Sequence, residues 1–244
     1  MKIQMTTLAA AISLAISGAA LANTDVDQLN DNLDDVSGVT INDPAGVTIN
    51  TQQNGRGNSA MVFQANGSTA ESRVYQDSQD SVAGVYQEGD NQYSDVDQQI
   101  TQSGVAGVAQ FGSSQRSRIQ QNGADNSYAG VLQAGSSNDA FISQANVGCS
   151  AENNVAGIAQ DGTDNRSGIR QLSSNNIALS AQFGDLNESY IVQRSGSGLG
   201  QEAYSLQDGT ENESEIIQGS LGTTTNNLAV LTQVGDYNES FITQ

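Results

Sequence analysis

The fold is decided by a short unit of which residues 156–171 are one complete copy: Ala156-Gly-Ile158-Ala-Gln160-Asp-Gly162-Thr-Asp-Asn165-Arg-Ser167-Gly-Ile169-Arg-Gln171. The unit holds two runs in which every second residue is of a type that recurs from copy to copy. These are Ala, Ile and Gln in the first run and Asn, Ser, Ile and Gln in the second. Alternation with a period of two is typical of an extended strand with one buried face. The glycine between the runs can take the positive φ that a tight reversal needs. The unit therefore predicts a strand, a turn and a second strand.

Repetition of this unit extends the prediction to most of the chain. Its closing Gln recurs with gaps of mostly 11 or 12 residues, at Gln64, Gln76, Gln87, Gln98, Gln110, Gln121, Gln133, Gln144, Gln160, Gln171, Gln182, Gln193, Gln207, Gln218, Gln233 and Gln244. Ala stands four residues before every second Gln, and Ser stands four before the others except at Ala140. We therefore expect an all-β, two-sheet β-solenoid of about eight coils, with two strands in each coil. Inward amides of successive coils, about 4.8 Å apart, can then hydrogen-bond to one another in ladders, as in amyloid.

Three regions follow from the position of the repeats. Residues 1–22 have a basic start, an apolar run from Leu8 to Ile16 and small residues at Ala20 and Ala22, which is the pattern of a cleaved secretion signal. The apolar run is too short to span a bilayer, and no membrane span is predicted. Residues 23–57 form an acidic N-terminal leader, and residues 58–244 form the repeat solenoid.

Composition excludes several classes of function. The chain carries 8 basic and 27 acidic residues, a formal net charge of −19, so nucleic acid is not an expected partner. It has no His, and its one Lys lies in the signal. We therefore expect no enzyme, no catalytic residue, no metal site and no cofactor. The single Cys149 cannot form an internal disulfide and is interpreted as a loop residue, with an intermolecular thiol as the alternative.

The two ends of the predicted stack are candidate polymerisation edges. The first strand presents Asn58, Ala60, Val62 and Gln64, and the last presents Asn238, Ser240, Ile242 and Gln244, with the same pattern. An uncovered strand is a template for another strand, and an open head-to-tail contact produces fibres.

The pattern Ala-x-Val-x-Gln-x-Gly-x-x-Asn-x-Ser-x-Ile-x-Gln resembles the curlin repeat of curli subunits, over about residues 58 to 244. The resemblance implies a self-assembling subunit of functional amyloid in the extracellular biofilm matrix, with a role in surface adhesion. It also implies a second curli subunit as partner and export through an outer-membrane pore with its accessory factors. Residues 133–144 are similar to the minor, nucleating subunit, but residues 238–244 lack the basic residues of its last repeat. The nucleating and the bulk role both stay open, as does the surface to which the fibre adheres.

The leader carries a further expectation from the resemblance, because in curli subunits the segment before the repeats addresses the chain to its export pore. Residues 23–46 hold six Asp and do not match the Gly-rich form of that segment. Val26, Leu29, Leu33 and Val36 have helical spacing, so a short amphipathic helix and a disordered leader are both open.

Charged side chains form a predicted outward column on the Ser strands. It contains Arg116, Asp139, Arg166, Glu188, Glu213 and Glu239. The last three are like charges in succession, and we interpret them either as a solvated face or as gatekeepers that delay stacking.

Two other classes of solenoid are alternatives. Gly-Asp pairs at Gly89, Gly184 and Gly235 suggest calcium binding, although the nonapeptide period of such proteins is absent. An ice-binding solenoid would need flat Thr rows, and Thr is scattered here. The glycosylation-like Asn-x-Ser triplets at Asn165, Asn187, Asn212 and Asn238 recur at inward positions and are interpreted as core.

Overall fold

The computed structural model describes residues 36–41, 48–65, 69–145, 152–194, 200–219 and 227–244. Every regular element in these ranges is a β-strand. The strands are β1 (Val36–Ile41), β2 (Thr48–Arg56), β3 (Ser59–Ala65), β4 (Ala70–Gln79), β5 (Val82–Asp90), β6 (Gln92–Gln102), β7 (Val105–Ser113), β8 (Arg116–Asn122), β9 (Tyr128–Ser136), β10 (Asp139–Ala145), β11 (Val155–Thr163), β12 (Arg166–Gln171), β13 (Ile177–Phe183), β14 (Glu188–Gln193), β15 (Glu202–Asp208), β16 (Glu213–Gln218), β17 (Leu228–Val234) and β18 (Glu239–Thr243).

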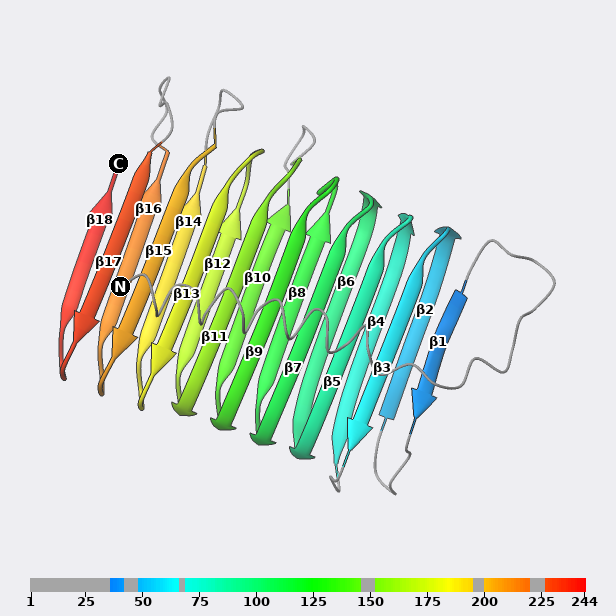
Figure 1. The fold of residues 1–244 in the computed structure, drawn as a ribbon, viewed down its shortest axis with the longest axis horizontal. Helices are drawn as coiled ribbons and strands as arrows, with labels where there is room; N and C mark the ends of the chain where they lie inside the picture. Colours follow the sequence, from blue (N-terminus) through cyan, green and yellow to red (C-terminus); the bar gives the residue numbers. More distant parts are fainter. Residues whose placement is uncertain (1–35, 42–47, 66–68, 146–151, 195–199, 220–226) are drawn as a thin grey trace.

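The strands form two parallel sheets that face each other (Figure 1). Sheet A contains the odd-numbered strands in the order β1-β3-β5-β7-β9-β11-β13-β15-β17, and sheet B contains the even-numbered strands from β2 to β18 in the same sense. Each strand pairs with the strand two positions later in the chain, and Gln pairs with Gln, as at Gln133 and Gln160. This topology is a β-solenoid with two strands in each coil, and it confirms the predicted fold class.

The space between the sheets is filled by aliphatic rows. Sheet B contributes Val74, Val96, Ile119, Ile142, Ile169, Ile191 and Ile216, and sheet A contributes the Ala row and Val62, Val85, Val108, Val131 and Ile158, all buried in one cluster. A fully buried Val or Ile side chain contributes about 1.5 to 3 kcal/mol. In β13 and β15 this position holds Ser180 and Ser205, whose hydroxyls bond across the core to Ser167 and Ser214 at 2.9 and 2.7 Å.

The glycine that recurs in successive turns is required by the close spacing of the coils. Gly112 has φ of 116°, and a Cβ atom there would lie 2.0 Å from the carbonyl oxygen of Gly135 in the next coil. Gly135 stands in the same relation to Gly162, at 2.1 Å. A side chain at any of these positions would push two coils apart, because the backbones are already in contact.

The sheets begin earlier than the sequence analysis placed them. Strands β1 and β2 lie in the range assigned to the leader, and they pair with β3 and β4, so each sheet holds nine strands where eight were expected. The run before Gln53 does alternate, but it has Ile49 and Thr51 where the repeat has Ser and Ile. The 11-residue gap between Gln53 and Gln64 is the signal that could have revealed the additional coil.

Several sequence expectations fall outside the described residues. These are the secretion signal at 1–22, most of the leader including Val26, Leu29 and Leu33, and Cys149. Val36, the last residue with helical spacing, begins strand β1. Among the described residues there is no helix with the length and apolar character needed to cross a bilayer.

Candidate functional site: amide ladders and open edges

Two ladders of Gln side chains run along the inside of the solenoid. In sheet B, Nε2 of each Gln donates to Oε1 of the Gln in the following coil through Gln53, Gln76, Gln98, Gln121, Gln144, Gln171, Gln193, Gln218 and Gln244, at 2.6 to 3.1 Å. In sheet A the series is Gln64, Gln87, Gln110, Gln133, Gln160, Gln182, Gln207 and Gln233, at 2.5 to 2.9 Å. The predicted ladder residues therefore lie in two continuous chains of hydrogen bonds.

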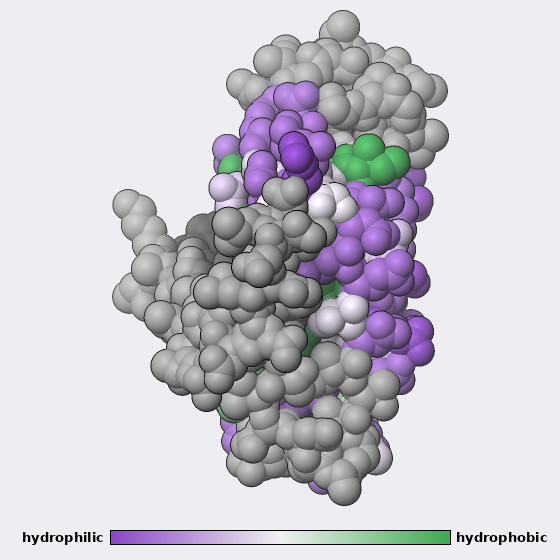
Figure 2. Space-filling model, turned by 90° about the vertical axis from the view of Figure 1, so that its right-hand side faces the viewer, coloured by the Kyte–Doolittle hydropathy of each residue, from purple (hydrophilic) through white to green (hydrophobic). Residues whose placement is uncertain are grey.

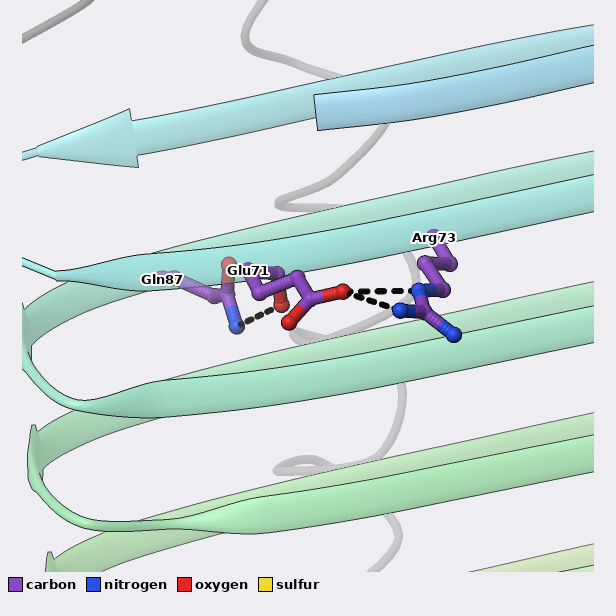
Figure 3. A network of polar contacts seen from close by, with 3 residues as sticks. All are labelled: Glu71, Arg73 and Gln87. Carbon is purple, nitrogen blue, oxygen red and sulfur yellow. Dashed lines mark hydrogen bonds and ion pairs between the residues drawn. The ribbon is translucent and has the colours of Figure 1, made fainter. Parts of the chain in front are cut away.

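The amide hydrogen bonds of both ladders run in one direction, and backbone carbonyls of the opposite sheet determine that direction. Nε2 of Gln121 also donates to the carbonyl of Val105 at 3.2 Å, and Nε2 of Gln133 donates to that of Arg116 at 3.0 Å. Rotating either amide would set its oxygen against a carbonyl oxygen, so the nitrogen must face that carbonyl. Figure 3 shows the arrangement at Gln87, which donates to the carbonyl of Glu71 while the Glu71 carboxylate points outward to Arg73. Both ladders thus donate toward the C-terminal coils.

A second set of amides closes the turns at the glycine edge. Nδ2 of Asn138 donates to the carbonyls of Ala134 and of Gly162 in the next coil, at 2.7 and 3.0 Å. Gln92 and Gln115 make the same pair of bonds from their own coils. Asn165, Asn187 and Asn212 of the Asn-x-Ser triplets are buried in this row, which places them in the core. The Asn-x-Ser triplets in the sequence mark Asn165, Asn187 and Asn212 of this row, whereas Gln92 and Gln115, in which Gln takes the place of Asn, were missed.

The two ends of the sheet B ladder carry complementary groups. At the N-terminal end Oε1 of Gln53 has no hydrogen-bond partner within the described residues. At the C-terminal end Nε2 of Gln244 donates to the carbonyl of Leu228 at 3.1 Å, and the side chain is exposed. The ladder therefore ends in a buried, unpartnered amide oxygen on one side and in an exposed amide N–H on the other. Figure 2 looks onto the end where β1 and β2 lie, and the described surface there is mainly hydrophilic with a small apolar patch.

The predicted N-terminal edge is wrong, because the strand that was expected to form it lies inside the sheet. Asn58, Ala60, Val62 and Gln64 are buried, and β3, which holds the last three, lies between β1 and β5. The N-terminal edge is formed by β1 and β2, because the sheets continue one coil beyond the recognised repeats. The C-terminal edge is β17 and β18, the latter with Ser240 and Ile242 half-buried and Gln244 exposed.

The charged column lies on the outside of sheet B. Arg116, Asp139, Arg166, Glu188, Glu213 and Glu239 occupy one register position in successive strands from β8 to β18. Arg166 and Glu188 form an exposed ion pair at 4.0 Å. Glu188, Glu213 and Glu239 follow one another as like charges, one coil apart.

Further charges on this face surround Asp97, which is half-buried. Its Oδ2 accepts a hydrogen bond from Gln99 at 3.0 Å, whereas its buried Oδ1 has no partner among the described residues. Burial raises the pKa of the Asp97 carboxyl, and the charge of Asp95 adds to the increase, while the Gln99 hydrogen bond and Arg118 oppose it. Asp95 itself is paired with Arg118 at 3.3 Å. The fold therefore disfavours the ionised form of Asp97.

Among the residues that the structure describes, no three Asp, Glu, His or Cys side chains meet in a group that could hold a metal ion.

These features define a class of protein: a repetitive, parallel β-solenoid whose interior consists of amide and aliphatic ladders and whose described residues end in one strand of each sheet, β1 and β2 at one end and β17 and β18 at the other. Comparison with known families gives a match to the curlin associated repeat at residues 118–145, which run from β8 to β10 and include Gln121, Gln133 and Gln144. No curated protein matches the chain.

The match at residues 118–145 supports the resemblance to the curlin repeat that the sequence indicated. That family is structural and non-enzymatic, and its members are extracellular fibre subunits that assemble with themselves. The repeat and the solenoid fold together indicate a structural subunit of the curli type.

The ladder predicts a large difference between two adjacent glutamines. Substitution Gln121→Met keeps the size of the side chain but removes the acceptor of Gln98 Nε2, the donor to Gln144 Oε1 and the amide N–H groups that bond to the carbonyls of Val105 and Ser127. We expect a loss of about 3 kcal/mol or more in the free energy of unfolding, measured by urea denaturation of the monomer. The control Gln120→Met, on the outward face of the same strand, should cost less than about 0.5 kcal/mol. Equal costs at the two positions would contradict the ladder.

A raised pKa at Asp97 predicts a pH-dependent gain from Asp97→Asn. A carboxyl whose pKa is higher in the folded state than in the unfolded state favours folding at low pH, and this contribution is lost as pH rises through the folded pKa. The Asn variant should therefore unfold at a higher temperature than the parent at neutral pH, with the difference shrinking in acid. Thermal unfolding at both pH values measures this, and a variant that is less stable at neutral pH would refute the assignment.

Proposed function

We propose that this chain is a structural subunit of extracellular, curli-type amyloid fibres and that the fibres grow as copies stack end to end. The observation that supports this most directly is the pair of complementary ladder ends, the exposed amide of Gln244 and the buried, unpartnered Oε1 of Gln53. Stacking would join them and continue both sheets from one copy to the next. A head-to-tail contact of this kind does not close on itself, so it produces a fibre.

The register of the proposed joint follows from the register inside the chain. Position 49 aligns with Ser72, Thr51 with Val74 and Gln53 with Gln76. The same offsets would set Ser240 against position 49, Ile242 against Thr51 and Gln244 against Gln53 of the next copy. Strand β17 would meet β1. Position 49, Thr51 and Gln53 therefore replace Asn58, Ala60, Val62 and Gln64 as the N-terminal half of the proposed contact.

The biological setting is part of the proposal and rests on the curlin repeat. The chain would lose residues 1–22 on secretion, pass through the periplasm and an outer-membrane pore with its accessory factors, and assemble at the bacterial cell surface. Residues 23–57 contain the candidate export address, although strand β2 already belongs to the solenoid. The fibre would then contribute to the biofilm matrix and to surface adhesion.

Whether the chain nucleates fibres or supplies their bulk is decided by its growth without seeds. A second curli subunit would take the other role. A purified chain that forms fibres at once behaves as the nucleating subunit, whereas a long lag that preformed seeds abolish is the behaviour of a bulk subunit.

Backbone groups at the C-terminal edge allow a sharp test of stacking. The N–H of Glu188 donates to the carbonyl of Asn212 in the following coil, and the N–H of Glu213 donates to that of Asn238, both at 2.8 Å. The outward residues of each strand therefore donate toward the C-terminal neighbour. In β18 these are Glu239, Phe241 and Thr243, whose N–H groups face the open edge.

The variant Phe241→Pro removes one such N–H while leaving the pairing of β18 with β16 in place. We expect its monomer to fold as the parent does and its elongation rate on parent seeds to fall about tenfold or more, because a lost hydrogen bond and a steric block act together. The control Phe241→Ala keeps the N–H and should elongate at nearly the parent rate. Amyloid-dye fluorescence and circular dichroism of the monomer measure the two quantities. Undiminished elongation by the proline variant would rule out this edge.

The acidic end of the outward column is proposed to act as a gatekeeper. Glu188, Glu213 and Glu239 lie one coil apart, so each adds repulsion to the ordered stack. At about 5 Å in water one such contact is worth just under about 1 kcal/mol. This repulsion would delay assembly until the chain has left the cell.

Substitution Glu213→Gln removes two of these repulsive contacts and should shorten the lag before fibre growth at low salt. Its matched control is Glu215→Gln on the same strand, whose register neighbours are Tyr190 and Phe241. The difference between the variants should vanish at high salt, because the exposed charges are then screened. Identical lag times at low salt would remove the gatekeeper role.

A further inference from the structure

The first coil, formed by β1 and β2, departs from the repeat in the rows that fill the core. In β2, Thr51 occupies the register position of Val74. In β1, Thr40 occupies the register position of Val62. Both strands of the first coil therefore carry Thr where the second coil carries Val. Thr has the branched shape of Val, but its hydroxyl loses hydrogen bonds to water when it is buried without a partner.

Strand β1 also pairs irregularly with its neighbour. Val36 aligns with Ser59 but Val39 aligns with Met61, so β1 holds one residue more than β3 over this stretch. An additional residue of this kind interrupts the ladder of backbone hydrogen bonds and bends the strand. β1 is also short, with six residues. Short and bulged edge strands are a common means by which β-proteins limit pairing with other chains.

The last coil, in contrast, keeps the pattern of the repeat. Strands β17 and β18 pair with β15 and β16 in unbroken register, and Ser240 and Ile242 align with Ser214 and Ile216. In the Ser row, Oγ of Ser214 donates to Oγ of Ser189 at 3.2 Å. The C-terminal edge is therefore suited to a strand that continues the Ser row and the Ile row.

End-to-end stacking as proposed above would bring these two unlike edges together. Its register sets Gln244 against Gln53, whose buried Oε1 would accept a hydrogen bond from the exposed amide of Gln244. The amide ladder would continue through the joint, so the register of the contact would be retained.

The two other inward rows of sheet B would be mismatched at the same joint. Ser240 would align with Ile49, and Ile242 would align with Thr51, so neither row continues with its own kind. The joint would bury less apolar surface than a contact between two coils inside the chain, and it would bury hydroxyls beside aliphatic groups. The first coil therefore weakens the joint without changing its register.

We propose that the first coil is an end cap that slows the stacking of this chain onto copies of itself, and that Ile49 and Thr51 are the residues of β2 that limit the contact. This inference rests on the end-to-end stacking proposed above and specifies which edge limits it. The partner that the C-terminal edge fits best is a β-solenoid chain whose first coil carries Ser and Ile in these two rows. An atypical terminal repeat with a capping role is a general feature of solenoids.

The cap differs from the acidic gatekeeper column in how it acts. Glu213 and its neighbours repel through exposed charges, which salt screens. The cap acts through packing inside the joint, so its effect should persist at high salt.

The test uses the chain from Asn23 onward with Phe241→Pro as an end blocker. This protein can bind through β1 and β2 to the fibre end that exposes β17 and β18, but its own C-terminal edge does not accept another copy. It should therefore lower the elongation of parent fibres to the rate of the opposite end. Adding Ile49→Ser with Thr51→Ile restores the repeat pattern in β2, and we expect half-maximal inhibition at a concentration about tenfold lower or less, because both rows then continue.

The matched control introduces the same two residues at outward positions of the same strand. Asn50 and Gln52 are exposed, and Asn50→Ser with Gln52→Ile leaves the inward rows unchanged. Combined with Phe241→Pro, this pair should inhibit at the same concentration as Phe241→Pro alone. Circular dichroism of each monomer verifies that the solenoid is folded, and the inhibition is measured by amyloid-dye fluorescence at low and at high salt.

Stronger inhibition by the inward pair alone, at both salt concentrations, supports the cap. Equal inhibition by the inward pair and by Phe241→Pro alone overturns it, as does an equal gain from the outward pair or a gain that salt removes. If neither blocker inhibits elongation at any concentration, the end-to-end contact itself is wrong. A failure of the cap is thus distinguishable from a failure of stacking.

Discussion

A buried primary amide must find partners for its N–H groups and its oxygen, and this requirement organises the whole molecule. Gln121 meets it with Gln98 in the preceding coil, Gln144 in the following coil and two backbone carbonyls. An unsatisfied buried polar group costs about 1 to 3 kcal/mol, so a register shift that broke the ladder would be penalised at every coil. The amides therefore specify the register, and the aliphatic rows beside them supply burial.

The same requirement accounts for where the chain varies. At the glycine edge the coils touch, since a Cβ at Gly112 would lie 2.0 Å from the carbonyl of Gly135, and the turn keeps its length. At the other edge successive Gln positions of one sheet are separated by 22 residues in some coils and by 27 in others without disturbing the ladder bond. Insertions therefore occur at the edge of the coils that contains neither the Gln ladder nor the close contact between glycine backbones.

Direction and surface character follow from the ladder as well. Because the amides in both ladders donate toward the C-terminal coils, the two ends of the solenoid are chemically different, which the proposed head-to-tail stacking requires. The outward residues are free of this requirement, and the two sheets use that freedom differently. Sheet B carries charges such as Arg118 and Asp95, paired at 3.3 Å, whereas the middle of the sheet A face is apolar.

The repeat in the sequence by itself determined the two-sheet solenoid, the inward rows and the Gln ladders, because identical residues at a fixed period can meet only if each coil stacks on the last. The start of the stack is marked in the sequence only by the 11-residue gap between Gln53 and Gln64, since β1 and β2 lack the recurring Ala and Ser and are held by pairing with β3 and β4. The repeat could not determine the direction of the amides, which depends on carbonyls of the opposite sheet, as at Gln133 and Arg116. The burial of Asp97 likewise arises only when strands distant in sequence are brought side by side. Local alternation specifies which face of a strand is buried, whereas the identity of its neighbours is a property of the assembled coils.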